Sequence, residues 1–195
     1  KEHGGDPRNA RGGVVIGVKM DGDINNGLLW IRANGLSVNP DEGYLDRDAV
    51  NFIYAKDNED VTAKFVGHFK EPKKEIRGGK LTGKTVEVEG DAVALWTPED
   101  ATIMRKRGGL VTGASTKEYS WQMALAFVGI KKWNQANTEL VVNMLDAFLE
   151  AGRRIKNSDE ALRQASRIAN DVFKAEGTSP QFWYEMYKGK PEVDP

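Results

Sequence analysis

The stretch "GVVIGVKMDGDINNGLLWIRANGL" (Gly13–Leu36) contains the pattern that decides the fold. Its first six residues are glycine or apolar and rich in β-branched side chains, which is typical of a buried parallel strand. A polar turn follows, after which Ile24, Leu28 and Ile31 recur at a spacing that places them on one face of a helix. Gly35 is well suited to end that helix. The stretch therefore predicts a strand, a turn and a helix.

The polar turn also resembles the start of a calcium-binding loop, because Asp21, Asp23 and Asn25 alternate. An EF-hand loop needs Gly at its sixth position and a chelating Glu at its twelfth. Those positions hold Asn26 and Arg32, and the pattern before the loop predicts a strand where an EF-hand has a helix. The sequence therefore favours a strand-to-helix turn in which Asp23 caps the helix.

The alternation of strand and helix continues along the first part of the chain. Strands are predicted at 49–55, 91–96 and 109–115, and helices at 58–69 and 97–108. The helix at 97–108 has Thr97 as its predicted N-cap, acids in its first turn and bases in its last. Such alternation is typical of an α/β layer with a parallel sheet.

The segment 70–89 departs from this pattern, because it is charged, contains three glycines and ends in a hairpin-like "KTVEVE". We interpret it as a surface insertion. A partner contact is one interpretation of its role, and a solvated loop is the more expected one.

The pattern changes after Ser115. One strand-like run, Trp121–Ile130, precedes three predicted helices that open at Thr138, Ser158 and Ser179. In the second of these helices, five side chains are predicted to face inward: Leu162, Ala165, Ala169, Val172 and Phe173. We therefore expect an α/β lobe over 13–115 and a mainly helical part over 116–190.

Composition excludes several classes of function. The 195 residues include 39% hydrophobic and 29% charged side chains, a globular balance, and the formal net charge of −1 provides no general attraction to nucleic acid or anionic membranes. The absence of cysteine excludes disulfides and thiolate chemistry, and two distant histidines, His3 and His68, do not suggest a metal centre. No apolar run approaches the ~20 residues of a membrane helix. Because the chain does not begin with Met, we expect a processed or truncated product.

Two predicted strands end where ligands bind in open α/β sheets, at the carboxyl edge. Asp21 follows the first strand, and Trp96 and Thr97 follow the third. Exposed N–H groups near Asn25 could donate to a ligand, Asp21 could accept from one, and Trp96 could form an aromatic wall. The alternatives are a capped helix without a ligand and a Trp96 side chain in the core.

The order of these features resembles that of type II periplasmic solute-binding proteins. The likeness rests on "DGDINN" with "LLWIRANGL", on "VNFIYA", on "GDAVALWTPEDATIMRKRGG" with "LVTGAS", and on "NTELVVNMLDAFLEAGRRIKN". These motifs, within about 13–157, are most similar to the nitrate/sulfonate/taurine-type ABC transporter binding family and to the related OmpA-associated binding domains. Relative to that family, the first half of lobe one is absent before Lys1, and 70–89 is an additional segment. The chain is then a fragment, a reduced scaffold, or one whose missing segment is supplied elsewhere.

The resemblance implies a periplasmic or extracytoplasmic protein that binds a small polar or anionic solute in an interlobe cleft, without a cofactor. Its ligand contacts would come from Asp21, Gly22, Asp23 and Asn25 on one loop and from Trp96 and Thr97 on another, and 113–116 would be the hinge. The partners would be the solute and an ABC transporter permease.

Two other functions compete with solute binding. Some relatives of this fold are enzymes that use histidine and cysteine, but this chain has no Cys, and neither histidine lies at a predicted cleft edge. No nucleophile and base are paired in the sequence pattern, so a non-enzymatic role is favoured. A ligand-free structural or protein-interaction domain is the alternative, favoured by the incomplete lobe and the charged segment 70–89.

Overall fold

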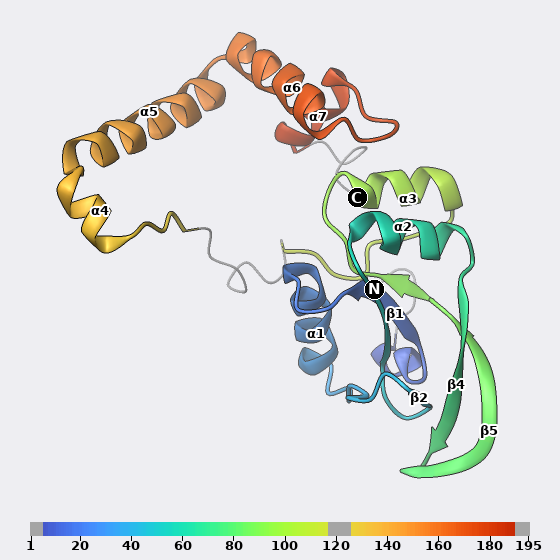
Figure 1. The fold of residues 1–195 in the computed structure, drawn as a ribbon. Helices are drawn as coiled ribbons and strands as arrows, with labels where there is room; N and C mark the ends of the chain where they lie inside the picture. Colours follow the sequence, from blue (N-terminus) through green and yellow to red (C-terminus); the bar gives the residue numbers. More distant parts are fainter. Residues whose placement is uncertain (1–5, 117–125, 190–195) are drawn as a thin grey trace. The chain divides into compact units, whose positions relative to one another are not determined.

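The computed structural model describes residues 6–116 and 126–189, and the chain divides into two compact units, Lys1–Met123 and Ala124–Pro195. The first unit contains both sheets and the second is helical, so the protein is mixed α/β, as predicted. Figure 1 shows the elements along the chain. Within the described part of the chain, no helix is long and apolar enough to cross a membrane.

A parallel three-stranded sheet forms the centre of the first unit. Its strands are β1 (Val14–Val18), β3 (Asn51–Ala55) and β6 (Ala92–Val93), in the order β3-β1-β6. Val14 pairs with Asn51, and Ile16 pairs with Val93. The three predicted strands are therefore present, although the third is only two residues long.

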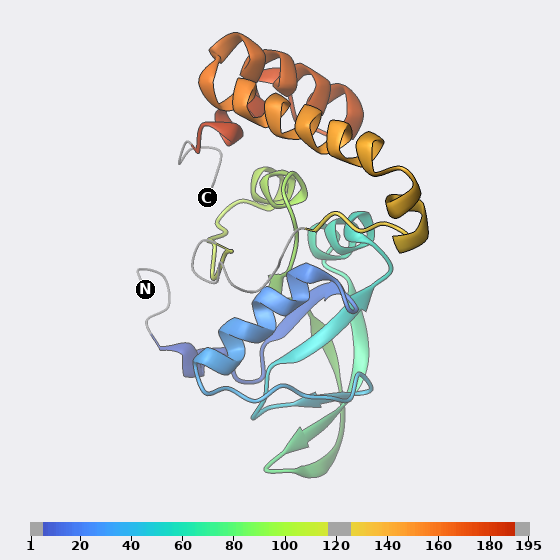
Figure 2. The same cartoon turned by 90° about the vertical axis from the view of Figure 1, so that its left-hand side faces the viewer.

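One face of this sheet is covered by α1 (Gly22–Ala33), which Figure 2 shows across β1 and β3. Ile24 and Ile31 are buried on it and pack with Phe52 of β3. Gly17 permits this close approach, because a Cβ atom at that position would lie 2.7 Å from Cγ1 of Ile24. A short 3-10 helix, η1 (Pro7–Ala10), precedes the sheet.

The opposite face is covered by α2 (Asn58–Val66) and α3 (Glu99–Arg107), which lie side by side. Val61, Phe65 and Ile103 bury their side chains against β1 and β3. The guanidinium of Arg107 in α3 lies 3.9 Å from the Phe65 ring centroid and donates to the Phe65 carbonyl. These contacts fix the two helices, and hence their N-termini, at the carboxyl edge of the sheet.

A second sheet of order β2-β4-β5 is formed by β2 (Tyr44–Asp46), β4 (Lys70–Arg77) and β5 (Lys80–Glu89). Strands β4 and β5 form an antiparallel hairpin whose turn, Gly78–Gly79, has positive φ at both residues. The predicted hairpin over 70–89 is present, but it is not a solvated loop. Val88 is buried with Leu45 in the core that α2 and α3 cover. The end of the hairpin that contains Val88 therefore packs into the core of the first unit.

The residues of the second unit that the structure describes form four helices: α4 (Lys131–Ala136), α5 (Thr138–Asn157), α6 (Asp159–Phe173) and α7 (Pro180–Tyr187). Ser158 and Ser179 cap α6 and α7 through their side chains, as predicted. Thr138 is the first residue of α5 and does not cap it. Its hydroxyl donates to the carbonyls of the preceding helix instead.

Only part of the face of α6 that was predicted to point inward is buried. Leu162 and Ala169 are buried, whereas Val172 and Phe173 are 69% and 60% exposed. Phe173 stacks on Trp183 of α7 with ring centroids 5.0 Å apart, so the contact with α7 occupies one side of its ring.

Two predicted strands differ from the structure. Residues 109–115 form no strand, because Gly108 and Gly109 both adopt positive φ and turn the chain away from an extended path. In the predicted strand 121–130, residues 121–125 lie outside the described residues, and 126–130 have no regular structure.

Candidate functional site

The carboxyl ends of β1 and β6 lie at one edge of the parallel sheet, because Ile16 pairs with Val93 and both strands run in the same direction. The chain leaves β1 through Lys19, Met20 and Asp21 and enters α1. It leaves β6 through 94–98 and enters α3. Two helix N-termini are therefore positioned at this edge, which is where open α/β sheets bind ligands.

The N-cap of α1 is Asp21, which corrects the prediction that Asp23 has this role. Asp21 has an extended backbone, and its Oδ1 accepts from the Gly22 N–H at 2.6 Å. The helix thus begins at Gly22, and Asp23 lies in its first turn. Just before the cap, Met20 has a φ of 63°, uncommon for a residue with a side chain, and that side chain is 91% exposed.

Asp23 is the most perturbed carboxyl at this edge. Burial, followed by the charges of Asp21, Asp100 and Glu99, raises its pKa from 3.8 to about 7. Its Oδ2 atom is buried and receives no hydrogen bond from the described residues. The first turns of α1 and α3 therefore bring carboxyl groups close enough to repel one another.

The N-terminus of α3 contributes the other carboxyl groups at this edge, those of Glu99 and Asp100. Thr97 does not cap the helix, since its hydroxyl donates to Asp100 Oδ2 at 3.1 Å instead. Asp100 Oδ1 accepts from the Ala101 N–H. Burial raises the pKa of Glu99, and the charges of Asp100 and Glu59 contribute to the shift. Trp96 is 44% exposed, so its side chain is not in the core.

The six predicted ligand residues thus all lie at the carboxyl edge, but they play different parts. Asp21 and Gly22 form the cap, Asn25 is exposed, and Asp23 is held among other acids. Trp96 and Thr97 lie on the neighbouring segment.

Three residues of the site were missed. From the sequence, Glu99 and Asp100 are predicted only to be the acids that favour the first turn of a helix. Asn26, whose Oδ1 is buried without a donor among the described residues, gives no sequence signal.

The geometry does not support the calcium interpretation. Asp23 and Asn25 belong to α1, and Arg32, at the place of the chelating Glu, lies in the last turn of the same helix. Among the residues described, no group of three or more histidine, cysteine or acidic side chains could hold a metal ion. His68 lies away from this edge, paired with Glu89 at the end of β5.

Comparisons with protein-family models, with curated proteins and with solved structures give no match to this chain. The fold class that the structure defines is thus a mixed α/β protein with parallel and mixed sheets.

Proposed function

We propose that this protein binds a small polar solute at the carboxyl edge of β1 and β6, without catalysing a reaction. The observation that carries the proposal is the buried Oδ2 of Asp23, which has no hydrogen-bond donor among the described residues. An unpaired buried acceptor costs free energy, and a ligand that donates to it removes that cost. The exposed Met20, with its uncommon backbone, lies in the same turn.

The charges favour a particular ligand chemistry. Asp21, Asp23, Glu99 and Asp100 are all acidic, and they repel one another as the pKa of Asp23 indicates. An anionic solute would add to this repulsion, so of the polar and anionic solutes expected from the sequence we retain the polar ones. An amine, a guanidine or a hydroxyl-rich molecule fits better, and the exposed Trp96 could contact a cation through its ring face.

The wider role that we propose is the substrate-binding component of an ABC-type uptake system outside the cytoplasm, on a type II periplasmic-binding-protein scaffold. The support for this role is the sequence resemblance alone. Hinge movement at 113–116 belongs to the same proposal.

A thermal-shift screen tests the binding site. Amines, amino acids and sugars are compared with organic acids and sulfonates, because a ligand that binds only the folded state raises Tm with its concentration. We expect donors and cations to raise Tm, and Asp23→Asn to reduce that rise. Glu87→Gln removes an acid from an exposed position on β5 and is the matched control. A rise produced only by anions, or one unaffected by Asp23→Asn, would refute the proposed site.

A protein-interaction domain is the second candidate, and one observation favours it. Large apolar side chains along α5 are exposed, each by half or more: Leu140, Val142, Met144, Phe148 and Leu149. Exposed apolar surface of this extent is typical of a protein contact. Self-association that disappears on Phe148→Glu, together with the absence of any ligand-induced Tm rise, would favour this candidate.

A further inference from the structure

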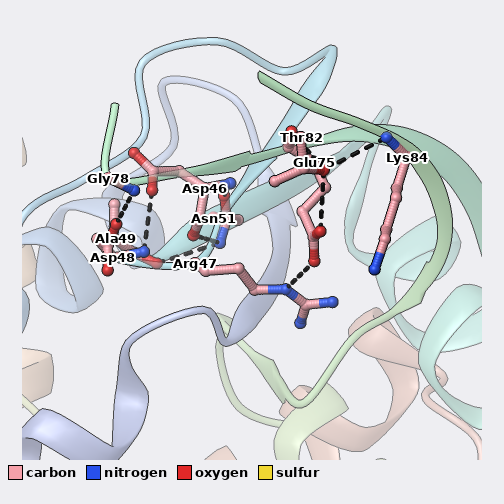
Figure 3. Close-up of polar contacts among 9 residues, drawn as sticks. All are labelled: Asp46, Arg47, Asp48, Ala49, Asn51, Glu75, Gly78, Thr82 and Lys84. Carbon is pink, nitrogen blue, oxygen red and sulfur yellow. Dashed lines mark hydrogen bonds and ion pairs between the residues drawn. The ribbon is translucent and has the colours of Figure 1, made fainter. Parts of the chain in front are cut away.

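The loop between β2 and β3 is held at the opposite, amino edge of the parallel sheet. Asn51, the first residue of β3, is fully buried, and its side chain both accepts hydrogen bonds from the loop and donates them to it. Its Oδ1 accepts from the Asp46 N–H, and its Nδ2 donates to the carbonyls of Asp46 and Ala49 (Figure 3). The backbone around Arg47 is therefore fixed by a core residue.

The hairpin holds the same loop from its other side. The Arg47 N–H donates to the Ile76 carbonyl at 3.0 Å, and Asp48 Oδ2 accepts from the Gly78 N–H at 2.7 Å. The second contact fastens the loop to the hairpin turn, as Figure 3 shows.

The side chain of Arg47 is oriented by a buried carboxylate. Its Nε donates to Glu75 Oε1 at 2.7 Å, while Thr82 Oγ1 donates to Glu75 Oε2 at 3.0 Å. Glu75 is only 7% exposed, and the hydrogen bond from Arg47, followed by that from Thr82, lowers its pKa. The carboxylate thus stays ionised and holds the guanidinium in one orientation.

A second cation, Lys84, is linked to Thr82 through its backbone. The Lys84 N–H donates to Thr82 Oγ1, and in Figure 3 the Lys84 side chain extends to the same side of the hairpin as the guanidinium of Arg47. Within residues 6–116 and 126–189, neither the Lys84 ammonium nor the two terminal nitrogens of Arg47 form a hydrogen bond or an ion pair. Three nitrogen donor groups therefore remain for a ligand.

We infer that Arg47 and Lys84 form a binding site for an oxoanion, meaning a phosphate, sulfate or carboxylate group of a ligand. A planar guanidinium offers paired N–H groups that match two oxygens of such an anion, and its preorganisation reduces the entropy lost on binding. Because Glu75 already balances the charge of Arg47, the remaining positive charge comes from Lys84 and from Arg77, whose charge also acts on Glu75. This site does not depend on the proposed solute site, which is acidic and lies at the opposite edge of the sheet.

Titration of the 15N-labelled chain with inorganic phosphate tests the inference, with NaCl used to hold ionic strength constant. We expect saturable amide shifts centred on the segments around Arg47 and Lys84. Parallel titrations with sulfate and acetate distinguish a preference for tetrahedral anions from a preference for carboxylates. Loss of one charge-assisted hydrogen bond in Lys84→Gln should weaken binding about tenfold.

Lys80→Gln is the matched control, because it removes an exposed cation from the same strand outside the Glu75 cluster. Its affinity for phosphate should stay within about twofold of the wild-type value, less than the effect of one hydrogen bond. Arg47→Lys keeps the charge but removes the paired donors, so it should weaken binding while the spectrum stays folded. Shifts spread over all exposed lysines, or equal affinities of Lys84→Gln and wild type, would overturn the inference and leave only general ionic screening.

Discussion

At the scale of single residues, Asp23 and Asn51 illustrate two states of a buried polar side chain. Asn51 is fully buried, and its side-chain oxygen and nitrogen both have hydrogen-bond partners. Asp23 has a buried oxygen to which none of the described residues donates, and three other acids lie near it. A satisfied polar side chain stabilises the fold, whereas an unsatisfied one at a helix N-terminus costs stability and is available to a ligand.

The first prediction concerns the pH dependence caused by Asp23. Its pKa rises from 3.8 to about 7 in the folded state, so the folded protein binds more protons than the unfolded chain between these values. The stabilising contribution is present below about pH 4 and is lost as the pH rises through 7. Asp23→Asn should therefore raise the free energy of unfolding at pH 8 by about 1 to 2 kcal/mol. The effect is no larger because solvent screens the charge of a half-buried carboxyl.

Urea unfolding at pH 4 and pH 8 measures this difference. The stability difference between Asp23→Asn and wild type should be small at pH 4 and should develop between pH 5 and 8. A variant that is equally stabilised at both values, or destabilised at pH 8, would contradict the assignment of the raised pKa to Asp23.

The second prediction concerns Asn51. Asn51→Ala leaves the Asp46 N–H and the carbonyls of Asp46 and Ala49 without their partner, at a cost of about 3 kcal/mol or more in the free energy of unfolding. Asn143→Ala, at an exposed position on α5, should change stability by less than about 0.5 kcal/mol. Urea denaturation measures both, and similar effects would contradict the role given to the Asn51 network.

At the scale of elements, helix starts divide into those with a side-chain cap and those without one. Ser158 accepts from the Ala161 N–H at the start of α6. Thr138 has the same sequence signal at the start of α5, but its hydroxyl bonds to the carbonyls of α4, because α4 ends directly before it. The local sequence therefore predicts where a helix begins. It does not predict which atom the hydroxyl of a Ser or Thr at that position contacts.

The third prediction follows from this pair of helices. Ser158→Ala removes a cap and should lower the free energy of unfolding of the helical unit by about 1 kcal/mol. Thr138→Ala removes no cap and places a better helix former at the first turn, so its effect should be near zero. Denaturation followed by far-UV circular dichroism compares the two, and an equal loss in both variants would contradict the capping assignment.

The elements that sequence predicted well are those with local signals. The strand and helix of 13–36 and the caps of α6 and α7 follow from periodicity and from single residues. Strand β2 was missed, because it has three residues and its partner β4 lies more than twenty residues further along the chain. The same limit applies to the site, since Glu99 approaches Asp23 only through the parallel pairing of β1 with β6.

At the scale of the whole molecule, the two units bury their apolar side chains unequally. The first unit has buried clusters on both faces of its parallel sheet. The second keeps large apolar side chains exposed along α5, including Leu140, Met144 and Phe148. An apolar helix face of this kind is typical of a surface that meets another element or chain.

The fourth prediction tests that exposed face. Phe148→Glu should leave the far-UV spectrum unchanged, because Phe148 is 56% exposed, and should reduce the binding of an apolar fluorescent dye such as ANS. Leu81→Glu, at an exposed apolar position near the hairpin turn, is the control and should reduce dye binding less. A loss of helix in Phe148→Glu would contradict the exposure of this side chain.

We propose that the buried Oδ2 of Asp23, which has no hydrogen-bond donor among the described residues, accepts from a ligand at the carboxyl edge of the sheet. NMR titration of the Asp23 side-chain carboxyl carbon tests this proposal. We expect a midpoint of about 7 for the free protein and a clearly lower midpoint in the presence of a cationic ligand found in the screen. A midpoint near the ordinary value of 3.8 in the free protein, or one unchanged by every ligand that raises Tm, would contradict it.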